Sequence, residues 1–265
     1  MIEWSHSLAG ALTGLIIGLT GVGGGAIMAP ILLLVFDISI GTVVATDLWF
    51  AALTKMAVIR IYSTHDHIDW KVARRLWLGS IPTSILVIIV LTCGSFTKLS
   101  GSLLQQGIGF LILLTSIGLL ISQILKKKEI NFTTSDFLKN VSSKFSKIRS
   151  GATIVAGGIV GVVVTLTSVG AGVLGTLVLI YLYSSHMASH KIVATEVVHA
   201  IPLALVAGIG YLICGKVDGI LLLSLLIGSV PAAILGASLA QKTNSNWLRI
   251  GIAIVMFLAG LKLVL

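Results

Sequence analysis

Residues 19–25 of this chain read Leu-Thr-Gly-Val-Gly-Gly-Gly and lie inside an uncharged apolar run from about Leu8 to Phe36. In a soluble protein, four glycines in five residues would indicate a loop, but these flanks predict a loop inside a membrane. Backbone that leaves a helix at that depth must be buried in protein or line a wet cavity, because lipid cannot hydrogen-bond its N–H and C=O groups. A helix broken there also offers free amides and the positive end of a helix dipole to an anion.

The same stretch occurs again as Leu-Thr-Ser-Val-Gly-Ala-Gly at residues 166–172, 147 positions later. Three further blocks match in the same order at an offset of 149: residues 45–47 with 194–196, 68–69 with 217–218, and 79–82 with 228–231. These matches indicate an internal duplication. Paired glycine-interrupted segments in two halves are typical of a transporter binding site. The alternative is that the glycines only allow helices to pack closely.

The composition assigns the chain to the membrane. Of its 265 residues, 56% are hydrophobic and 10% are charged, whereas soluble domains carry about 25% charged residues. The net charge of +9 does not indicate nucleic-acid binding, because seven of the eighteen basic residues lie between Lys126 and Arg149, as topology-setting charge does. No Walker, GxSxG or HExxH motif is present, so we expect no enzyme, no cofactor and no catalytic metal.

Hydrophobic runs predict an all-α polytopic membrane protein with two homologous halves of about four segments each. A membrane helix needs about 20 residues, and the runs lie at roughly 8–36, 40–62, 75–93, 101–125, 151–183, 192–213, 219–240 and 247–265. We expect residues 1–125 to form the first repeat, 126–150 a basic cytoplasmic linker, and 151–265 the second repeat. Within the linker, a short interfacial amphipathic helix is also possible.

The two glycine-containing runs are near 30 residues each and either cross once with a break or fold back as a hairpin. Basic residues at 60–75 and 126–149 place both connections in the cytoplasm. In the second half, a hairpin places three basic residues in the cytoplasm, Lys191, Lys242 and Arg249, whereas a single crossing places two there, Lys216 and Lys262. This count favours the hairpin. The two repeats are then inverted, which we prefer to a parallel arrangement, and their glycine-broken or re-entrant first segments meet near the midplane.

Ionisable residues inside membrane runs are costly and are functional candidates by default. Asp47 and Glu196 are equivalent under the repeat, and each follows a threonine. Lys55 lies about 80° round a helix from Asp47, so both can face one cavity, and His199 lies on the same helix face as Glu196. The alternative is a set of buried ion pairs that only fix helix packing. Asp69 and Asp218 precede the next helices and are expected to cap them.

Several of these segments together resemble the TauE/SafE family of sulfite exporters. The resemblance rests on LTGVGGG, on ATDLWFAALTK at 45–55 and GSIP at 79–82, and on TSVGAGVLG, ATEVVHAIPLALVAGIG and GSVPAAILGA in the second half. It covers nearly the whole chain, and the departures are Glu196 where relatives usually have Asp, and Gly219 where an aromatic residue is common. The resemblance implies a secondary carrier of sulfite or a small organosulfonate in the bacterial inner membrane.

The expected function is therefore secondary-active transport of a small sulfur oxyanion, in the direction of export, coupled to a proton or Na⁺ gradient. Backbone amides and hydroxyls at broken helices, with a cation nearby, suit an oxyanion. Alternatives are a cation or metal carrier and a non-transporting assembly factor. The lipid bilayer is the expected surrounding, no nucleic acid is expected, and a homodimer is left open. The expected substrate-binding residues are Thr20, Gly21, Gly23, Gly24, Gly25, Thr46, Asp47, Lys55, Thr167, Ser168, Gly170, Thr195, Glu196 and His199.

Overall fold

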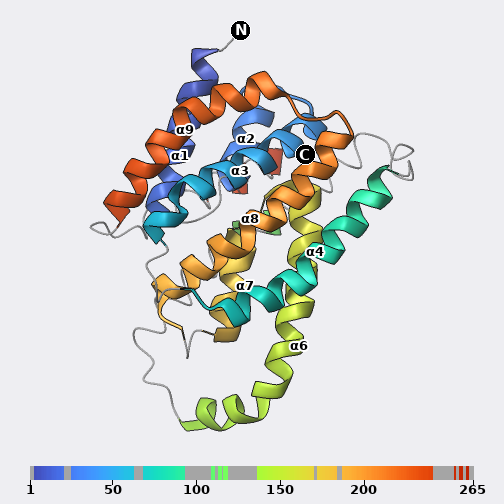
Figure 1. Ribbon diagram of the computed structural model, residues 1–265, viewed down its shortest axis with the longest axis vertical. Coiled ribbons are helices and arrows are strands. Elements are labelled where there is room, and N and C mark those ends of the chain that lie inside the picture. Colours follow the sequence, from blue (N-terminus) through green and yellow to red (C-terminus); the bar gives the residue numbers. More distant parts are fainter. Residues whose placement is uncertain are drawn as a thin grey trace.

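A computed structural model describes residues 3–20, 25–62, 68–92, 109–110, 113–114, 116–118, 136–169, 172–183, 187–240, 254, 257–258 and 261–262. Every regular element in this part of the chain is an α-helix, which confirms the predicted all-α class. The helices are α1 (Trp4–Thr20), α2 (Gly25–Leu34), α3 (Ile40–Tyr62), α4 (Trp70–Thr92), α6 (Asp136–Thr167), α7 (Val173–Tyr183), α8 (Ser189–Ile213) and α9 (Gly219–Ala240) (Figure 1).

Five of the described helices contain a stretch long and apolar enough to cross a membrane. They are α3, α4, α6, α8 and α9, and their spans are Ile40–Ile59, Trp70–Thr92, Arg149–Thr167, Lys191–Ile213 and Gly219–Leu239. The predicted segments at 101–125 and 247–265 lie mostly outside the described residues. Helix α6 begins at Asp136, inside the segment expected to be a linker, and its first turns run across the lower end of the molecule before the helix turns upward (Figure 1).

Each half ends a helix at its glycine stretch. Helix α1 ends at Thr20 and α2 begins at Gly25, while α6 ends at Thr167 and α7 begins at Val173. Because α1, α2 and α7 contain 17, 10 and 11 residues, none of them is as long as the spans of the other helices.

The two halves are interlocked, because the first helix of each packs along the last described helix of the other. Helix α1 lies against α9, and α6 lies against α4 (Figure 1). A Cβ atom added at Gly14 would lie 2.3 Å from the backbone oxygen of Ser229, and one added at Gly161 would lie 2.4 Å from that of Ser80. Gly14 and Ser80 match Gly161 and Ser229 under the repeat, so the two interfaces use equivalent small residues.

Helices α3 and α8 form the centre of the molecule. One buried apolar cluster joins Val44, Leu48 and Ala52 of α3 to residues of α6 and α8, among them Leu203 and Ala207. The outer helices instead expose large apolar side chains, as α4 does at Leu78, Ile85, Leu86 and Ile89. Because the outer helices surround α3 and α8, the polar side chains of these two helices are shielded from the bilayer.

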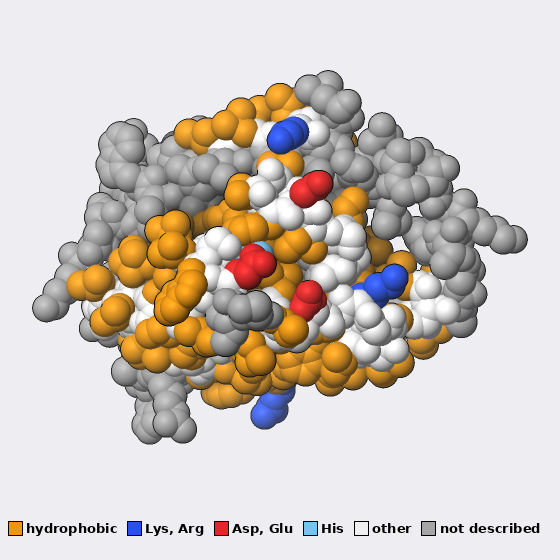
Figure 2. All heavy atoms as spheres, turned by 90° about the horizontal axis from the view of Figure 1, so that it is seen from above, with side chains coloured by type: hydrophobic (Ala, Val, Ile, Leu, Met, Phe, Trp, Pro, Cys, Tyr) orange, Lys and Arg blue, Asp and Glu red, His pale blue; other side chains and the backbone are white. Residues whose placement is uncertain are grey.

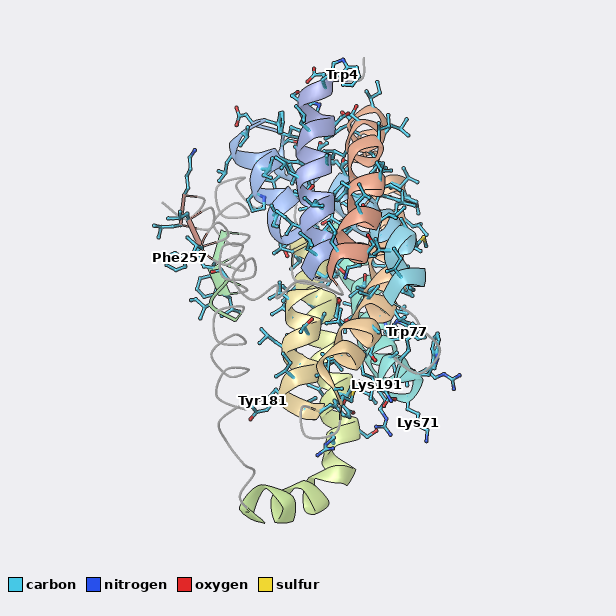
Figure 3. The ribbon with its side chains drawn as sticks, turned by 90° about the vertical axis from the view of Figure 1, so that its left-hand side faces the viewer. Trp4, Lys71, Trp77, Tyr181, Lys191 and Phe257 are labelled. Carbon is cyan, nitrogen blue, oxygen red and sulfur yellow. The ribbon has the colours of Figure 1, made fainter. Side chains whose placement is uncertain are left out.

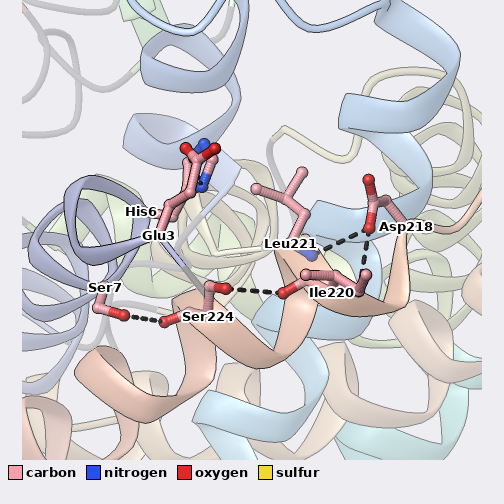
Figure 4. A network of polar contacts seen from close by, with 7 residues as sticks. All are labelled: Glu3, His6, Ser7, Asp218, Ile220, Leu221 and Ser224. Carbon is pink, nitrogen blue, oxygen red and sulfur yellow. Dashed lines mark hydrogen bonds and ion pairs between the residues drawn. The ribbon is translucent and has the colours of Figure 1, made fainter. Parts of the chain in front are cut away.

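Asp69 and Asp218 cap α4 and α9, as the sequence predicts. The Oδ1 atom of Asp218 accepts hydrogen bonds of 3.0 Å from the backbone N–H groups of Ile220 and Leu221 (Figure 4). Asp69 Oδ1 accepts the equivalent bonds from Lys71 and Val72 at 3.1 and 3.2 Å. These bonds satisfy amides that have no partner inside the first turn.

We expect Asp218→Ala to lower the stability of the folded protein by about 1 kcal/mol, because the first turn of α9 loses its cap. Thermal unfolding in detergent would measure the loss. Asp218→Asn is the control, since an amide oxygen can accept the same bonds and should retain most of the stability. Equal losses in both variants would show that the carboxylate charge, rather than the cap, matters.

Both caps also link the halves. The backbone N–H of Asp218 donates to Thr46 Oγ1 at 3.3 Å, and that of Asp69 donates to Thr195 Oγ1 at 3.0 Å. The beginning of α3 thus lies beside the beginning of α9, and the beginning of α8 beside that of α4. The end face at which α1 starts carries a few charged side chains among apolar and uncharged ones (Figure 2). Glu3, Asp37, Lys216 and Asp218 are exposed charged residues that lie next to the start of α1, the end of α2, the end of α8 and the start of α9, respectively.

Candidate functional site

The ionisable residues predicted to lie inside the membrane are all buried. Asp47, Glu196 and His199 have no exposed surface, and Lys55 is 1% exposed. Lys55 is also the single buried lysine or arginine among the residues whose burial is described. Because an isolated buried charge is very costly, each of these groups needs a partner or a proton.

Lys55 pairs with Glu196. The Nζ atom of Lys55 lies 2.9 Å from Glu196 Oε1, so the ion pair joins α3 of the first half to α8 of the second. The helical spacing predicted that Lys55 and Asp47 can face one cavity, and the ion-pair partner of Lys55 comes from the other half. Eight residues of helix separate Asp47 and Lys55 by about 12 Å along the axis, whereas α8 passes close to α3.

Asp47 is bound to the glycine stretch of the second half. Ser168, the first residue after α6, donates its hydroxyl to Asp47 Oδ2 at 2.5 Å. Ser168 has a φ of 55°, a left-handed conformation that is unfavourable for a residue with a side chain, and its equivalent in the first half is Gly21. The backbone of Ser168 is therefore strained at the position from which its hydroxyl reaches the buried carboxylate of Asp47.

His199 is held by α4. Its Nε2 atom lies 3.0 Å from Ser80 Oγ, and its backbone oxygen accepts a hydrogen bond from the indole of Trp77 at 3.1 Å. Neither Ser80 nor Trp77 was among the residues predicted for the site. The signal for Ser80 was present, because it lies in the duplicated GSIP block, and its equivalent Ser229 contacts Thr54 Oγ1 at 3.3 Å.

Three buried atoms of this cluster have no hydrogen-bond partner among the described residues: Asp47 Oδ1, Glu196 Oε2 and His199 Nδ1. Buried polar atoms are nearly always hydrogen-bonded, so an unpartnered one marks a place for a ligand, a water molecule or a proton. All three belong to residues chosen from the sequence as site candidates.

Other predicted site residues have local structural contacts. Thr46 and Thr195 accept the hydrogen bonds from Asp218 and Asp69 described above. Thr167 Oγ1 lies 2.8 Å from the carbonyl oxygen of Val163 and accepts from the amide of Val169 at 3.2 Å, which closes the end of α6.

The first glycine stretch is described only at its edges, at the last residue of α1 and the first of α2, Thr20 and Gly25. Gly21, Gly23, Gly24 and Gly170 lie outside the described residues. Gly175 of α7 packs against the side chain of Glu196. A Cβ atom added at Gly175 would lie 3.0 Å from Glu196 Cγ, so the glycine makes space for this side chain.

No group of three or more His, Cys, Asp or Glu side chains is placed to hold a metal ion in the part of the chain that the structure describes. The two carboxylates are instead used separately, Asp47 with a hydroxyl and Glu196 with an ammonium. This arrangement suits a small anion at Lys55 better than a hard divalent cation, which takes six or more oxygen ligands.

Comparison with known proteins finds relatives that match nearly the whole chain. The family model for the sulfite exporter TauE/SafE matches residues 7–263. The probable membrane transporter protein YjnA of Bacillus subtilis (strain 168) is 32% identical over 259 residues, which cover 97% of this chain and 98% of that protein. The probable membrane transporter protein YdhB of the same organism is 26% identical over 258 residues, covering 95% and 96%. No solved structure matches.

Proposed function

This chain belongs to the TauE/SafE family of sulfite exporters and is a multi-pass membrane transporter, and we propose that it carries a small sulfur oxyanion across the inner membrane. The substrate we propose is sulfite or a small organosulfonate, and the direction is export. The observation that carries this proposal is the buried Lys55–Glu196 pair, at which the central helices of the two halves meet.

An anion site at this place would combine one cation with backbone amides. The ammonium of Lys55 supplies charge-assisted hydrogen bonds, which are about twice as strong as neutral ones. Helices α2 and α7 each begin next to a glycine stretch, and the first amides of a helix are unpaired donors. A sulfonate or sulfite presents three oxygens, so it can accept bonds from several such donors at once.

We further infer that the repeats are inverted in the membrane. The supporting observation is that α1 starts at Trp4 at one end of the molecule, while its equivalent α6 starts at the opposite end (Figure 3). Lys71 and Lys191 lie toward the same end in that view. Because the connection at 60–75 is rich in basic residues, that end is cytoplasmic, and the exposed Asp37 and Lys216 then face outside.

Transport in proteoliposomes tests the proposed function. We expect labelled sulfite or ethanesulfonate to enter vesicles that contain the protein, to reach a higher level when the outside is acidic, and to lose that accumulation when a protonophore is added. Empty liposomes are the control. Absence of flux above this control for every sulfur anion would contradict the proposal. Accumulation that survives the protonophore would point to exchange or to a Na⁺ gradient.

A cation carrier is the second candidate, because two of the three unpartnered atoms are carboxylate oxygens, Asp47 Oδ1 and Glu196 Oε2. The ammonium of Lys55 beside Glu196 opposes it. Thermal unfolding separates the two functions: stabilisation by a divalent metal and by no oxyanion would favour the cation, and the reverse result would favour the anion.

A further inference from the structure

We propose that Glu196 is the coupling residue of the transporter: it holds Lys55 while the site is empty, and it takes up one proton when the anion displaces it. The inference rests on the proposed function, because it requires the substrate anion to bind Lys55. It goes further by assigning proton coupling to one side chain and by fixing the ratio of protons to anions.

The contacts of Glu196 leave Lys55 as its one charged partner among the described residues. Oxygen Oε1 accepts from Lys55 Nζ at 2.9 Å, while Oε2 has no hydrogen-bond partner in the described part of the chain. Both side chains are buried, so no bulk water replaces a partner that leaves.

Among the described residues, no helix packed against α8 places a second charged side chain within ion-pair distance of Glu196. Besides Lys55, α3 buries one further charged side chain of known burial, that of Asp47, which is bound to Ser168. Helix α4 contributes the uncharged Ser80 and Trp77, and α7 contributes Gly175 beside the Glu196 side chain. Among the α6 side chains whose burial is described, from residue 149 on, the buried polar ones are threonines. On α8 itself, His199 is held by Ser80 and has an unpartnered Nδ1 atom.

An anion and Glu196 therefore compete for one ammonium. Separating a buried ion pair leaves an uncompensated charge, which is strongly unfavourable in the interior of a protein. Protonation of the released carboxylate removes that charge: one O–H bond forms at Glu196, the proton comes from water on the side from which the anion enters, and no group is oxidised or reduced. The site then holds Lys⁺, the anion and a neutral acid, and its net charge is the same as in the empty Lys⁺–Glu⁻ pair.

Two consequences follow for a singly charged substrate. The anion and one proton move in the same direction, so the step is electrically silent. Net export then requires the anion concentration ratio across the membrane to exceed the opposing proton ratio, and the membrane potential alone does not drive it. The protein would thus release an anion that has accumulated inside, and it would stop when the anion gradient has fallen.

Glu196→Gln tests this role. Glutamine keeps an oxygen that can accept from Lys55 but carries no charge to compete with the anion. We expect the variant to bind ethanesulfonate more tightly than the wild type, by about tenfold or more, which is about 1.4 kcal/mol. We also expect it to take up one proton fewer per anion bound. Titration calorimetry in two buffers of different ionisation enthalpy gives both quantities, and a pH-sensitive dye in weakly buffered vesicles gives the ratio during transport.

Sulfite can itself carry a proton as hydrogen sulfite. For that anion, the role of Glu196 is therefore measured by the difference in protons taken up per anion between Glu196→Gln and the wild type. Ethanesulfonate stays singly charged and needs no such correction. Asp47→Asn is the matched control, because Asp47 is equivalent to Glu196 under the repeat and its hydrogen-bond partner is the Ser168 hydroxyl rather than a cation. Whatever its affinity, this variant should keep the proton-to-anion ratio of the wild type.

Three results would overturn the inference. The first is that the wild type binds ethanesulfonate without proton uptake, and the second is that the Glu196→Gln variant keeps the wild-type ratio of protons to anions. The third is that a folded Glu196→Gln variant binds the anion more weakly, because loss of the carboxylate that competes for Lys55 should strengthen anion binding. The first result needs no variant and decides the matter even if Glu196→Gln does not fold. A wild type that neither binds nor moves any sulfur anion would instead contradict the proposed function.

Discussion

Lys55→Met is expected to abolish most transport and to destabilise the protein at the same time. The variant removes the buried ammonium of Lys55, so anion binding and transport should fall at least about tenfold, or about 1.4 kcal/mol. It also leaves Glu196 buried without the ammonium that lies 2.9 Å from it. Removing one partner of a buried ion pair costs about 3 kcal/mol or more, because the other charge is left uncompensated.

The double variant Lys55→Met/Glu196→Gln separates the two effects. It contains no unpaired charge at this position, so we expect it to recover most of the lost stability in thermal unfolding while remaining inactive in proteoliposomes. Lys55→Arg should be partly active, because a guanidinium keeps the charge but is a flat fork rather than a compact donor. Normal transport by Lys55→Met would show that the anion site uses backbone amides and that Lys55 is structural.

The sequence was sufficient to select the buried ionisable side chains but not to pair them. Asp47, Lys55, Glu196 and His199 stand out because a charged residue in an apolar run is costly, and all four are buried. Their partners depend on how α3 and α8 pass each other, which periodicity along one helix does not contain. Lys55 therefore meets Glu196 of the other half, and Asp47 meets Ser168.

Local chemistry was predicted more completely. The capping bonds of Asp69 and Asp218 depend on a few consecutive residues, and the structure confirms both. Ser80 was missed as the partner of His199, because the contact spans 119 residues of sequence and a serine in an apolar helix is not distinctive by itself.

The role of the glycines could not be decided from the sequence. A glycine could either end a helix or allow two helices to pack closely, and the structure has glycines at both kinds of place. Helix ends lie at the duplicated stretches, whereas the close contacts between helices use Gly14 and Gly161, outside those stretches. A spacing of four residues from Gly10 to Gly14 and Gly18 was visible, but the partner helix was not.

Gly79→Ala is expected to destabilise the protein by about 3 kcal/mol, at the upper end of the usual cost of overpacking. A Cβ atom at Gly79 of α4 would lie 1.9 Å from the backbone oxygen of Ile154 and 2.7 Å from the backbone nitrogen of Gly158, both in α6. Backbone cannot rotate away as a side chain can, so the two helices must separate along their contact. Helix association in a membrane depends strongly on close van der Waals packing, so the loss is not recovered elsewhere.

Gly228→Ala and Gly151→Ala make this prediction specific. Gly228 is equivalent to Gly79 and would place its Cβ 1.9 Å from the backbone oxygen of Ser7, so it should cost a similar amount at the interface of α1 and α9. Gly151 lies on α6 with no atom within 4 Å of the added Cβ, and alanine there should stabilise the helix by up to about 1 kcal/mol. Thermal unfolding in detergent and the yield of membrane-inserted protein would measure all three variants. If Gly79→Ala and Gly151→Ala unfold at the same temperature, α4 and α6 do not pack as closely as described. If Gly79→Ala alone is unstable, the two interlocked interfaces contribute unequally to folding despite their equivalent residues.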